Sequence, residues 1–309
     1  MARVVVVGAG VSGLAAAALL EEHQIDYTLI EVKRRVGGSL ITQSVDGFLL
    51  DGAGFTSDIG LLHHPLMKAW GLQDSLQEGT SNVFFRRGVQ SLVDALSARV
   101  SGPRLMRMAL SSIGDLEDGA LALCLENGLM LNARAIILAL PARYAERVFY
   151  GYRSEITEHL LTYQYESRLR ISLGYRRDEI APVSSFAEHP DIVIQTAARL
   201  PERGGALVQW QMRTPRTSMT DEEVRKICID WEYPVPDAIF THHWAEADPL
   251  TPTTPEYPVW RDTLMAMLPP RVALIGSDYV AAPALVGTTP LSQCLTQAQD
   301  AVNKILGAL

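Results

Sequence analysis

The chain has 309 residues, of which 48% are hydrophobic and 20% are charged, so it is long and apolar enough for a sizeable core in two domains. Its formal net charge is −8 at pH 7 and it has no long basic run, which argues against nucleic acid or an anionic membrane surface as a partner. Three cysteines, Cys124, Cys228 and Cys294, lie far apart without a Cys-x-x-Cys pair, so we expect no disulfide framework and no metal site.

No apolar stretch reaches the length of a membrane span. The opening residues are apolar but are interrupted by glycine, and Arg3 is their only positive flank. They therefore predict a buried strand and helix rather than a signal peptide. Together with the cysteine usage, this pattern favours a cytoplasmic protein.

The first predicted element is a strand at Val4–Val7, followed at once by Gly8, Gly10 and Gly13 and then by an alanine- and leucine-rich helix. In a dinucleotide-binding turn the first glycine permits the tight turn, and the second lets the backbone approach a pyrophosphate. The third lets the helix pack against the strand. The N-terminus of that helix would then point free N–H groups at the phosphates, so this segment predicts a dinucleotide site.

A second strand is predicted at Tyr27–Ile30, and Glu31 follows it 18 residues after Gly13. A carboxylate at this place can accept the hydroxyls of an adenosine ribose. It would repel the additional phosphate of NADP, so the residues alone leave FAD or NAD as the cofactor.

The next loop carries Arg35, Gly37, Gly38 and Ser39 after Glu31. The order of an acid, three residues, Arg, one residue and Gly-Gly resembles the signature of the flavin amine oxidase and protoporphyrinogen oxidase superfamily, which includes phytoene desaturases and small renalase-like proteins. The resemblance implies FAD, with Arg35 neutralising the pyrophosphate and the two glycines close to the ribityl chain or flavin ring. Ser39 stands where the family usually has a basic residue.

Two further segments resemble the same superfamily. Asp51-Gly52-Ala53-Gly54 after Phe48–Leu50 is similar to the Asp-x-Gly element beside the flavin ring. Near the other end, a strand at Val272–Ile275 runs into Gly276-Ser277-Asp278, and a helix is predicted from about Pro290 to Leu306. The resemblance implies that Ser277 or Asp278 contacts the phosphate or ribityl, and that the last helix points its N-terminus at the flavin.

The segments between these motifs predict the rest of the cofactor domain. We expect a helix at Gly88–Leu96, strands at Arg104–Ser112 and Gly119–Leu131 with turns at Gly114-Asp115 and Asn127-Gly128, and a strand from Arg134 that ends in Ala139-Leu140-Pro141. Thr288 and Thr289 are the expected entry and cap of the last helix. The candidate cofactor-binding residues are Gly8, Gly10, Val11, Ser12, Gly13, Glu31, Val32, Arg35, Gly37, Gly38, Ser39, Asp51, Gly52, Ala53, Gly54, Leu110 (near the adenine), Ala139, Gly276, Ser277, Asp278, Thr288 and Thr289.

The predicted fold is a Rossmann-type α/β domain for FAD interwoven with a smaller α+β substrate domain. The FAD domain is expected at 1–60, 86–145 and 262–309, and the substrate domain at 61–85 and 146–261. The substrate part should contain a helix at Leu61–Trp70, three strands, a helix at Asp221–Trp231 capped by Thr220, and a last strand near Ala238–Trp244.

Catalysis in this superfamily is carried by the flavin, and the sequence offers no acid–base triad. The candidates for residues near the reaction are His243, Trp244 and Tyr257, with a histidine as a base. Many amine oxidases hold a water at the flavin with a lysine from the substrate sheet. None of the four lysines of this chain falls on a predicted strand facing the flavin.

These features predict an FAD-dependent oxidoreductase with non-covalent FAD. It would take a hydride from an amine, a reduced N-heterocycle or a porphyrinogen-like substrate and pass the electrons to oxygen or another acceptor. No second Gly-x-Gly-x-x-Gly is present, which argues against a relay from NAD(P)H. The alternatives are a non-catalytic flavin-fold accessory protein and an NAD-dependent Rossmann enzyme.

Overall fold

The main sheet is built around the first strand of the chain. The computed structural model describes residues 2–176, 191–281 and 287–309. In the main sheet the strands follow the order β8-β2-β1-β11-β10-β9, with β16 also pairing with β11. The pairs β8–β2, β2–β1, β1–β11 and β11–β16 are parallel, whereas β9 and β10 are added antiparallel. The strands are β1 (Ala2–Val7), β2 (Tyr27–Glu31), β8 (Arg104–Met106), β9 (Leu110–Asp115), β10 (Leu121–Leu125), β11 (Met130–Leu138) and β16 (Val272–Leu274).

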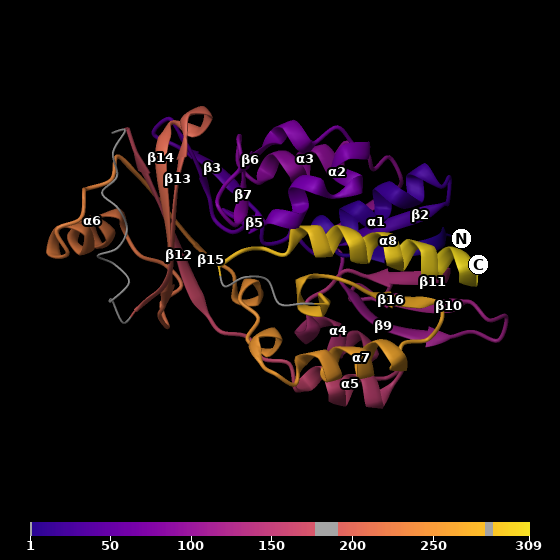
Figure 1. Ribbon diagram of the computed structural model, residues 1–309. Helices are drawn as coiled ribbons and strands as arrows, with labels where there is room; N and C mark the ends of the chain where they lie inside the picture. The colour runs from indigo at the N-terminus through magenta and orange to yellow at the C-terminus, as the bar shows by residue number, and fades with distance from the viewer. Residues whose placement is uncertain (1, 177–190, 282–286) are drawn as a thin grey trace.

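Two layers of helices cover this sheet (Figure 1). On one face lie α1 (Val11–Glu22), α3 (Gln90–Ser97) and the long α8 (Leu291–Ala308), which share a core with the apolar β1 side chains. On the other face, α4 (Ala142–Phe149), α5 (Ser154–Leu161) and α7 (Tyr257–Met267) pack with β9 and β10 in a second core. The β-branched run of β1 is buried on both sides, as a central parallel strand requires.

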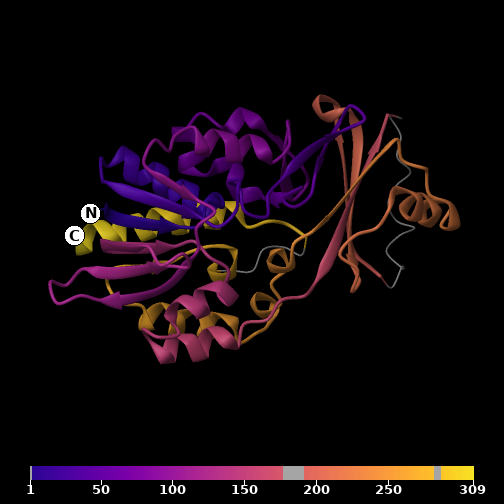
Figure 2. The same ribbon diagram turned by 180° about the vertical axis from the view of Figure 1, so that it is seen from behind.

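A second, antiparallel sheet stands at the other end of the molecule (Figures 1 and 2). It has the order β13-β14-β12-β15, and α6 (Asp221–Asp230) packs on its outer face through a third apolar core. Its strands are β12 (Arg168–Tyr175), β13 (Ile192–Leu200), β14 (Gly205–Arg213) and β15 (Ala238–His243). The predicted fold class, a Rossmann-type part joined to a smaller α+β part, is therefore confirmed.

Short elements connect the two sheets. The hairpin β3 (Thr42–Val45)–β4 (Phe48–Asp51) and the small sheet β5 (Ser57–Asp58)–β7 (Asn82–Phe85)–β6 (Leu76–Glu78) lie between them. A fourth apolar cluster includes Phe48, Phe55 and Phe84 from this region together with Leu200 and Leu207 of the second sheet. The second sheet is thus packed directly on the hairpin that ends in Asp51.

Three local predictions need correction. The predicted helix at Leu61–Trp70 is a 3-10 turn at Ile59–His63 followed by α2 (Pro65–Ala69), because His64 is extended (ψ 130°) before Pro65. The predicted strand at Arg104–Ser112 is two strands, since Arg107 has φ 59° and breaks the ladder. Gly114 and Asp115, predicted as a turn, lie inside β9.

The cap predicted for the helix of the second sheet is confirmed. Thr220 accepts a hydrogen bond from the Glu223 N–H at 3.3 Å, and the Glu223 side chain returns one to the Thr220 N–H at 2.8 Å. This reciprocal capping box fixes where α6 begins.

Among the described residues, no helix is both long and apolar enough to cross a membrane. Within the same ranges no group of three or more His, Cys, Asp or Glu could hold a metal ion. The three cysteines are free thiols.

Candidate cofactor and substrate site

The glycine turn between β1 and α1 is wound too tightly for side chains at two of its positions. Gly8 has φ +100°, and a Cβ there would lie 2.3 Å from the Ala139 carbonyl oxygen. A Cβ on Gly13 would lie 1.8 Å from the Gly8 carbonyl oxygen. Gly10 is different, because the nearest heavy atom to its Cβ position would be the Gly38 Cα at 4.0 Å. The Gly10 and Gly38 backbones lie close together, because a Cβ on Gly38 would be only 3.3 Å from the Gly10 Cα, and both line the large cavity, which leaves an open slot beside them.

The N-terminus of α1 faces this slot without a ligand from the protein. Gly10 is the N-cap and provides no side-chain hydrogen bond, and the first turn of α1 has no acidic residue. The first N–H groups of a helix have no partner within the helix and carry its positive dipole end. The slot thus has the donor set that a pyrophosphate requires.

Glu31 is held in a fixed orientation beside the turn. One carboxylate oxygen accepts the Ala9 N–H and the other accepts the Lys33 N–H, both at 2.7 Å. The residue is only 6% exposed, yet it lines the cavity. Each carboxylate oxygen can accept a further hydrogen bond, so Glu31 is oriented to receive two hydroxyl groups of a ligand.

A cavity of about 700 Å³ extends from the turn along the ends of the parallel strands. This size is within the range of ligand and cofactor sites. Most of the residues predicted from the sequence as cofactor ligands come together on its wall: Gly8, Gly10, Val11, Ser12, Gly13, Glu31, Val32, Gly37, Gly38, Ser39, Leu110, Ala139, Gly276, Ser277, Asp278 and Thr289.

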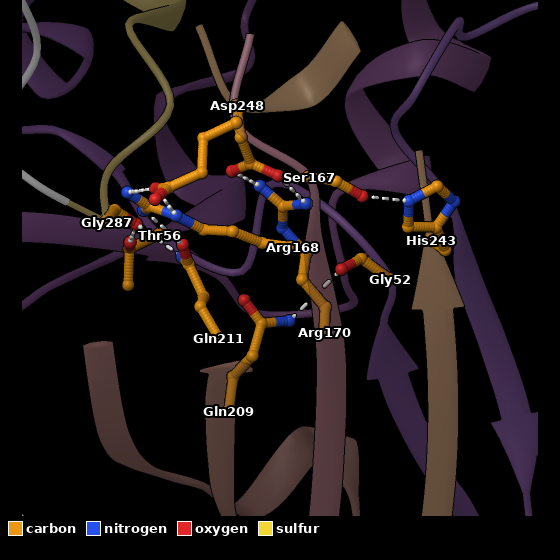
Figure 3. A network of polar contacts seen from close by, with 11 residues as sticks. Gly52, Thr56, Ser167, Arg168, Arg170, Gln209, Gln211, His243, Asp248 and Gly287 are labelled. Carbon is orange, nitrogen blue, oxygen red and sulfur yellow. Dashed lines mark hydrogen bonds and ion pairs between the residues drawn. The ribbon is translucent and has the colours of Figure 1, made fainter. Parts of the chain in front are cut away.

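A smaller cavity of about 140 Å³ adjoins the large one, and Ser39, Ser277 and Thr289 line both. Ala53, Gly54 and Thr288, also predicted as cofactor ligands, line only the smaller cavity. Its opposite wall is the inner face of the second sheet, with polar side chains from β12 and β14 (Figure 3). These side chains are Arg168, Arg170, Gln209 and Gln211, accompanied by Asp248.

The polar wall is ordered by ion pairs. Arg170 donates to both carboxylate oxygens of Asp248, at 2.9 and 2.5 Å, and each side chain is 6% exposed. Arg168 contacts the Gln211 side chain at 3.4 Å (Figure 3). It also binds Glu166 at 2.5 Å. Sequence reasoning missed these arginines, although their period-two spacing on a predicted strand puts both on one face.

Comparison with known proteins agrees with this geometry. A model for an NAD(P)-binding Rossmann-like domain matches residues 6–60, and one for flavin containing amine oxidoreductase matches residues 52–177. The chain is similar to a mitochondrial protoporphyrinogen oxidase of Nicotiana tabacum, with 49% identity over 49 residues, and to a flavin-containing amine oxidase A of Canis lupus familiaris, with 52% over 42 residues. Residues 52–177 thus match the flavin containing amine oxidoreductase family.

The curated relatives are matched only in short segments. The matches cover 16% and 14% of this chain, and 10% and 8% of the tobacco and dog proteins respectively. Solved structures extend the likeness of fold to the whole chain. A putative protoporphyrinogen oxidase from Exiguobacterium sp. 255-15 has a TM-score of 0.79 at 14% identity, covering 98% of each chain. A putrescine oxidase triple mutant redesigned in cofactor binding has a TM-score of 0.68 at 12% identity, covering 99% of each.

The match to flavin containing amine oxidoreductases indicates FAD as the cofactor, and the large cavity fits it. The glycine slot, the uncapped end of α1 and the oriented Glu31 suit the pyrophosphate and ribose of an adenine dinucleotide. The same match favours FAD over the NAD of the alternative Rossmann enzyme.

Three of the predicted cofactor residues do not line either cavity. The Arg35 guanidinium donates to the carbonyls of Val36, Gly38 and Leu40, at 3.2, 2.8 and 3.0 Å, so it orders its own loop. Asp51 is fully buried and forms an ion pair with Arg203. Gly52, beside it, lies against the His242 ring. These three residues do not line either described cavity themselves but belong to the loops that do.

The predicted catalytic residues are separated by the fold. His243 and Trp244 line the large cavity, where His243 Nε2 lies 2.7 Å from the Ser167 hydroxyl (Figure 3). Tyr257 lines neither described cavity, and its hydroxyl donates to the Asp278 and Val280 carbonyls at 3.0 and 2.7 Å. The structure therefore gives Tyr257 a packing role instead of a place beside the cofactor.

The neighbour of the predicted His243 is His242, on β15, whose ring lies against the Gly52 backbone. Burial, with the nearby positive charges of Arg170 and Arg35, lowers the pKa of His242 to about 4. His242 is therefore neutral at pH 7 and is too weak a base for efficient proton abstraction there.

The expected cap of the last helix is wrong in detail. The N-cap of α8 is Pro290, and neither Thr288 nor Thr289 caps it with a side chain. Thr289 instead pairs with the short β5 strand in a parallel bridge, since its N–H donates to the Thr56 carbonyl at 2.9 Å and its carbonyl accepts the Asp58 N–H at 3.2 Å. The start of α8 still reaches the large cavity, because Leu291 and Cys294 line it.

Proposed function

We propose that this chain is an FAD-dependent oxidoreductase, in which a substrate in the smaller cavity delivers a hydride to FAD in the larger one. The adjoining cavities carry this proposal, because Ser39, Ser277 and Thr289 belong to both walls. When bound, FAD supplies the two-electron acceptor, and oxygen or another acceptor later removes the electrons.

The chain's own residues bind, orient and exclude water in this scheme. The α1 N-terminus would bind the pyrophosphate, and Glu31 would accept the ribose hydroxyls. Burial raises the pKa of Cys294 to about 12, so this thiol on the cavity wall stays protonated and is a poor nucleophile. We therefore propose non-covalent FAD.

The charges of the smaller cavity argue against a protonated amine as substrate. Its described lining has two guanidinium groups, of Arg168 and Arg170, and one carboxylate, of Asp248. Both oxygens of Asp248 are already bound by Arg170. Among those lining residues Phe55 is the sole aromatic and no lysine is found, so neither a free carboxylate nor an aromatic cage is available to an ammonium group.

The size of the smaller cavity limits the substrate further. About 140 Å³ suits one ring better than a tetrapyrrole, because ligand pockets for larger molecules start near 300 Å³. Gln209 and Gln211 offer neutral hydrogen-bonding groups on the same wall. Of the three expected substrate classes, we therefore propose a small reduced N-heterocycle, neutral or anionic, over an aliphatic amine or a porphyrinogen.

The proposal includes the arrangement of the chain and its location. We propose that 1–60, 86–145 and 262–309 hold FAD. Of the segments expected on the substrate side, 61–85 and 146–261, only the part from β12 to β15 surrounds the second sheet, whereas 61–85 and α5 pack in the two cores of the main sheet. We also propose a cytoplasmic protein, supported by the three unpaired cysteines.

The first experiment is the visible absorption spectrum of the purified protein, followed by identification of the flavin released on denaturation. Release of FAD is the expected result, and a colourless protein that cannot be reconstituted with FAD would sink the proposal. Bound FAD that no amine, reduced heterocycle or porphyrinogen reduces anaerobically would instead favour the accessory-protein alternative.

Substrate charge is tested with three probes that share one ring: benzoate, benzamide and benzylamine. Benzoate and benzamide should perturb the flavin spectrum on titration, whereas benzylamine should not. Arg168→Met should weaken benzoate binding about tenfold, or about 1.4 kcal/mol. Arg213→Met is the matched control, because Arg213 also binds Glu166 but is 61% exposed and lines neither described cavity. Tight benzylamine binding would contradict the charge argument.

A further inference from the structure

A buried ion pair joins the second sheet to the loop behind the smaller cavity. Arg203 lies in the 3-10 turn Pro201–Arg203 at the tip of the β13–β14 hairpin. Its Nη1 is 2.9 Å from Asp51 Oδ2, and both side chains are 0% exposed. The contact is a charge contact without the alignment of a hydrogen bond. An arginine with no solvent exposure is rare unless a carboxylate compensates its charge.

The rest of the Arg203 side chain is held by the same hairpin that carries Asp51. Its Nε and Nη2 donate to the Leu49 carbonyl at 2.8 and 2.6 Å. The guanidinium carbon lies 5.5 Å from the centre of the Phe55 ring. Arg203 thus contacts one residue before the Asp51–Gly54 loop, one within it and one after it. These contacts fix the position of the loop relative to the hairpin tip.

Asp51 is also held by β3 and by the start of α3. Its Oδ1 accepts the Thr42 hydroxyl at 2.6 Å and the Val89 N–H, at the start of α3, at 3.1 Å. Burial raises the pKa of this carboxyl, and the Arg203 charge opposes that rise. The carboxylate is therefore the point where α3, β3 and the hairpin tip of the second sheet meet.

The backbone of the same loop is bound by the inner face of the second sheet. The Asp51 carbonyl accepts the Ser172 hydroxyl at 2.6 Å and the Gln209 amide at 2.9 Å. Ser172 and Gln209 face each other across β12 and β14. Next along the loop, a Cβ on Gly52 would lie 2.6 Å from His242 Cγ, so the sheet touches the backbone there without any gap.

We propose that Arg203 is a positioning residue, which fixes the Asp51–Gly54 loop so that the second sheet sets the place of the flavin ring relative to the substrate cavity. The loop continues from Asp51 into Ala53 and Gly54, which line the smaller cavity. Gln209 binds the loop and lines that cavity as well. A shift of the sheet would therefore move the loop and the substrate wall together. This inference rests on the proposed function, because it places the flavin ring beside the smaller cavity that the loop lines.

The alternative is that the pair only stabilises the fold, and a double-variant cycle separates the two roles. Arg203→Met leaves the Asp51 carboxylate buried without its partner, which should destabilise the protein strongly. Asp51→Asn combined with Arg203→Met leaves no unpaired buried charge, so its apo-protein should recover most of the lost stability. The double variant still lacks the link from the hairpin tip to Leu49 and Asp51.

The experiment measures FAD affinity, the flavin absorption spectrum and the unfolding midpoint of the apo-protein for wild type and four variants. Arg203→Met and the double variant should each raise the FAD Kd at least tenfold and change the position or fine structure of the visible flavin band. Arg203→Lys keeps the charge and can reach one of the two acceptors, so its Kd should fall between those of wild type and Arg203→Met. Glu202→Gln is the control, since Glu202 is the preceding hairpin residue and pairs with Arg86 at the surface.

Each outcome has a distinct meaning. A double variant that regains wild-type stability, FAD affinity and spectrum would show a purely structural pair and overturn the inference. The same holds if Arg203→Met binds FAD with the wild-type Kd and spectrum. If Arg203→Met does not fold, the double and Lys variants decide between the two roles. A wild-type protein that binds no FAD would overturn the proposed function instead, before any variant is compared.

Discussion

Replacing Gly10 with alanine tests the cofactor site with a single methyl group. Gly10 has φ −69° and ψ 179°, a conformation that alanine adopts without strain. Its added Cβ would find no protein atom closer than the Gly38 Cα at 4.0 Å. Restricting the unfolded chain stabilises by about 0.4–1 kcal/mol, and alanine is a poorer N-cap than glycine by a similar amount. We therefore expect the free energy of unfolding of the apo-protein to change by less than about 0.5 kcal/mol.

The same methyl group would occupy the slot proposed for the pyrophosphate. If it displaces one backbone hydrogen bond to a charged phosphate oxygen, about 1.5–3 kcal/mol of binding is lost. The FAD Kd should then rise roughly 10- to 100-fold. The measurements are urea unfolding of the apo-protein and titration of FAD fluorescence. A protein with a wild-type apo stability and a weakened FAD affinity is the expected result.

Gly151→Ala is the matched control for this substitution. A Cβ at Gly151 would meet no atom within 4 Å, and the residue lines neither described cavity. Its FAD affinity should equal that of wild type. If Gly10→Ala also binds FAD as tightly as wild type, the pyrophosphate does not pass through the Gly10–Gly38 slot, and the placement of the cofactor is wrong.

Two further predictions concern buried charges. Burial raises the pKa of Asp278 from 3.8 to about 6. Between these values the folded state keeps a proton that the unfolded state loses. The free energy of unfolding contributed by this group therefore falls as the pH rises from about 4 to 6. Relative to Asp278→Asn, the wild type should lose at most about 3 kcal/mol over this range, and parallel pH–stability curves would refute the shift. Arg170→Met should lower the free energy of unfolding by about 3–5 kcal/mol, because it leaves Asp248 buried and unpaired. Arg170→Met combined with Asp248→Leu should recover most of this loss, and urea unfolding measures both variants.

The features that could be predicted from the sequence are those whose cause is local. The turn from Gly8 to Gly13 follows from steric limits within a few residues, and so does the Thr220–Glu223 capping box. The break at His64 was also encoded locally, in the proline that follows it. The apolar residues of Leu61–Trp70 have a helical period, but the proline determines the local structure.

The features that could not be predicted depend on contacts between distant parts of the chain. Arg203 is an ordinary hairpin residue in the sequence, and only the packing of the second sheet on β4 brings it to Asp51. The Arg170–Asp248 pair likewise joins a strand to a proline-rich connection that has no motif of its own. A single sequence does not show which charged residues pair after folding, so the polar wall of the smaller cavity could not be predicted from it.

The cofactor part and the substrate part of the site are determined in different ways. The part of the site proposed to bind the dinucleotide is determined locally, by glycines and one acid on the central strands of a parallel sheet. The part that faces the substrate is determined by tertiary packing, through Arg170, Gln209 and Asp248. Changes on the second sheet can therefore alter the chemistry of the smaller cavity without disturbing the glycine turn. Asp51 is the exception, because it belongs to the cofactor motif and is bound by the second sheet. A substitution that moves the sheet should act on the cofactor through this residue first.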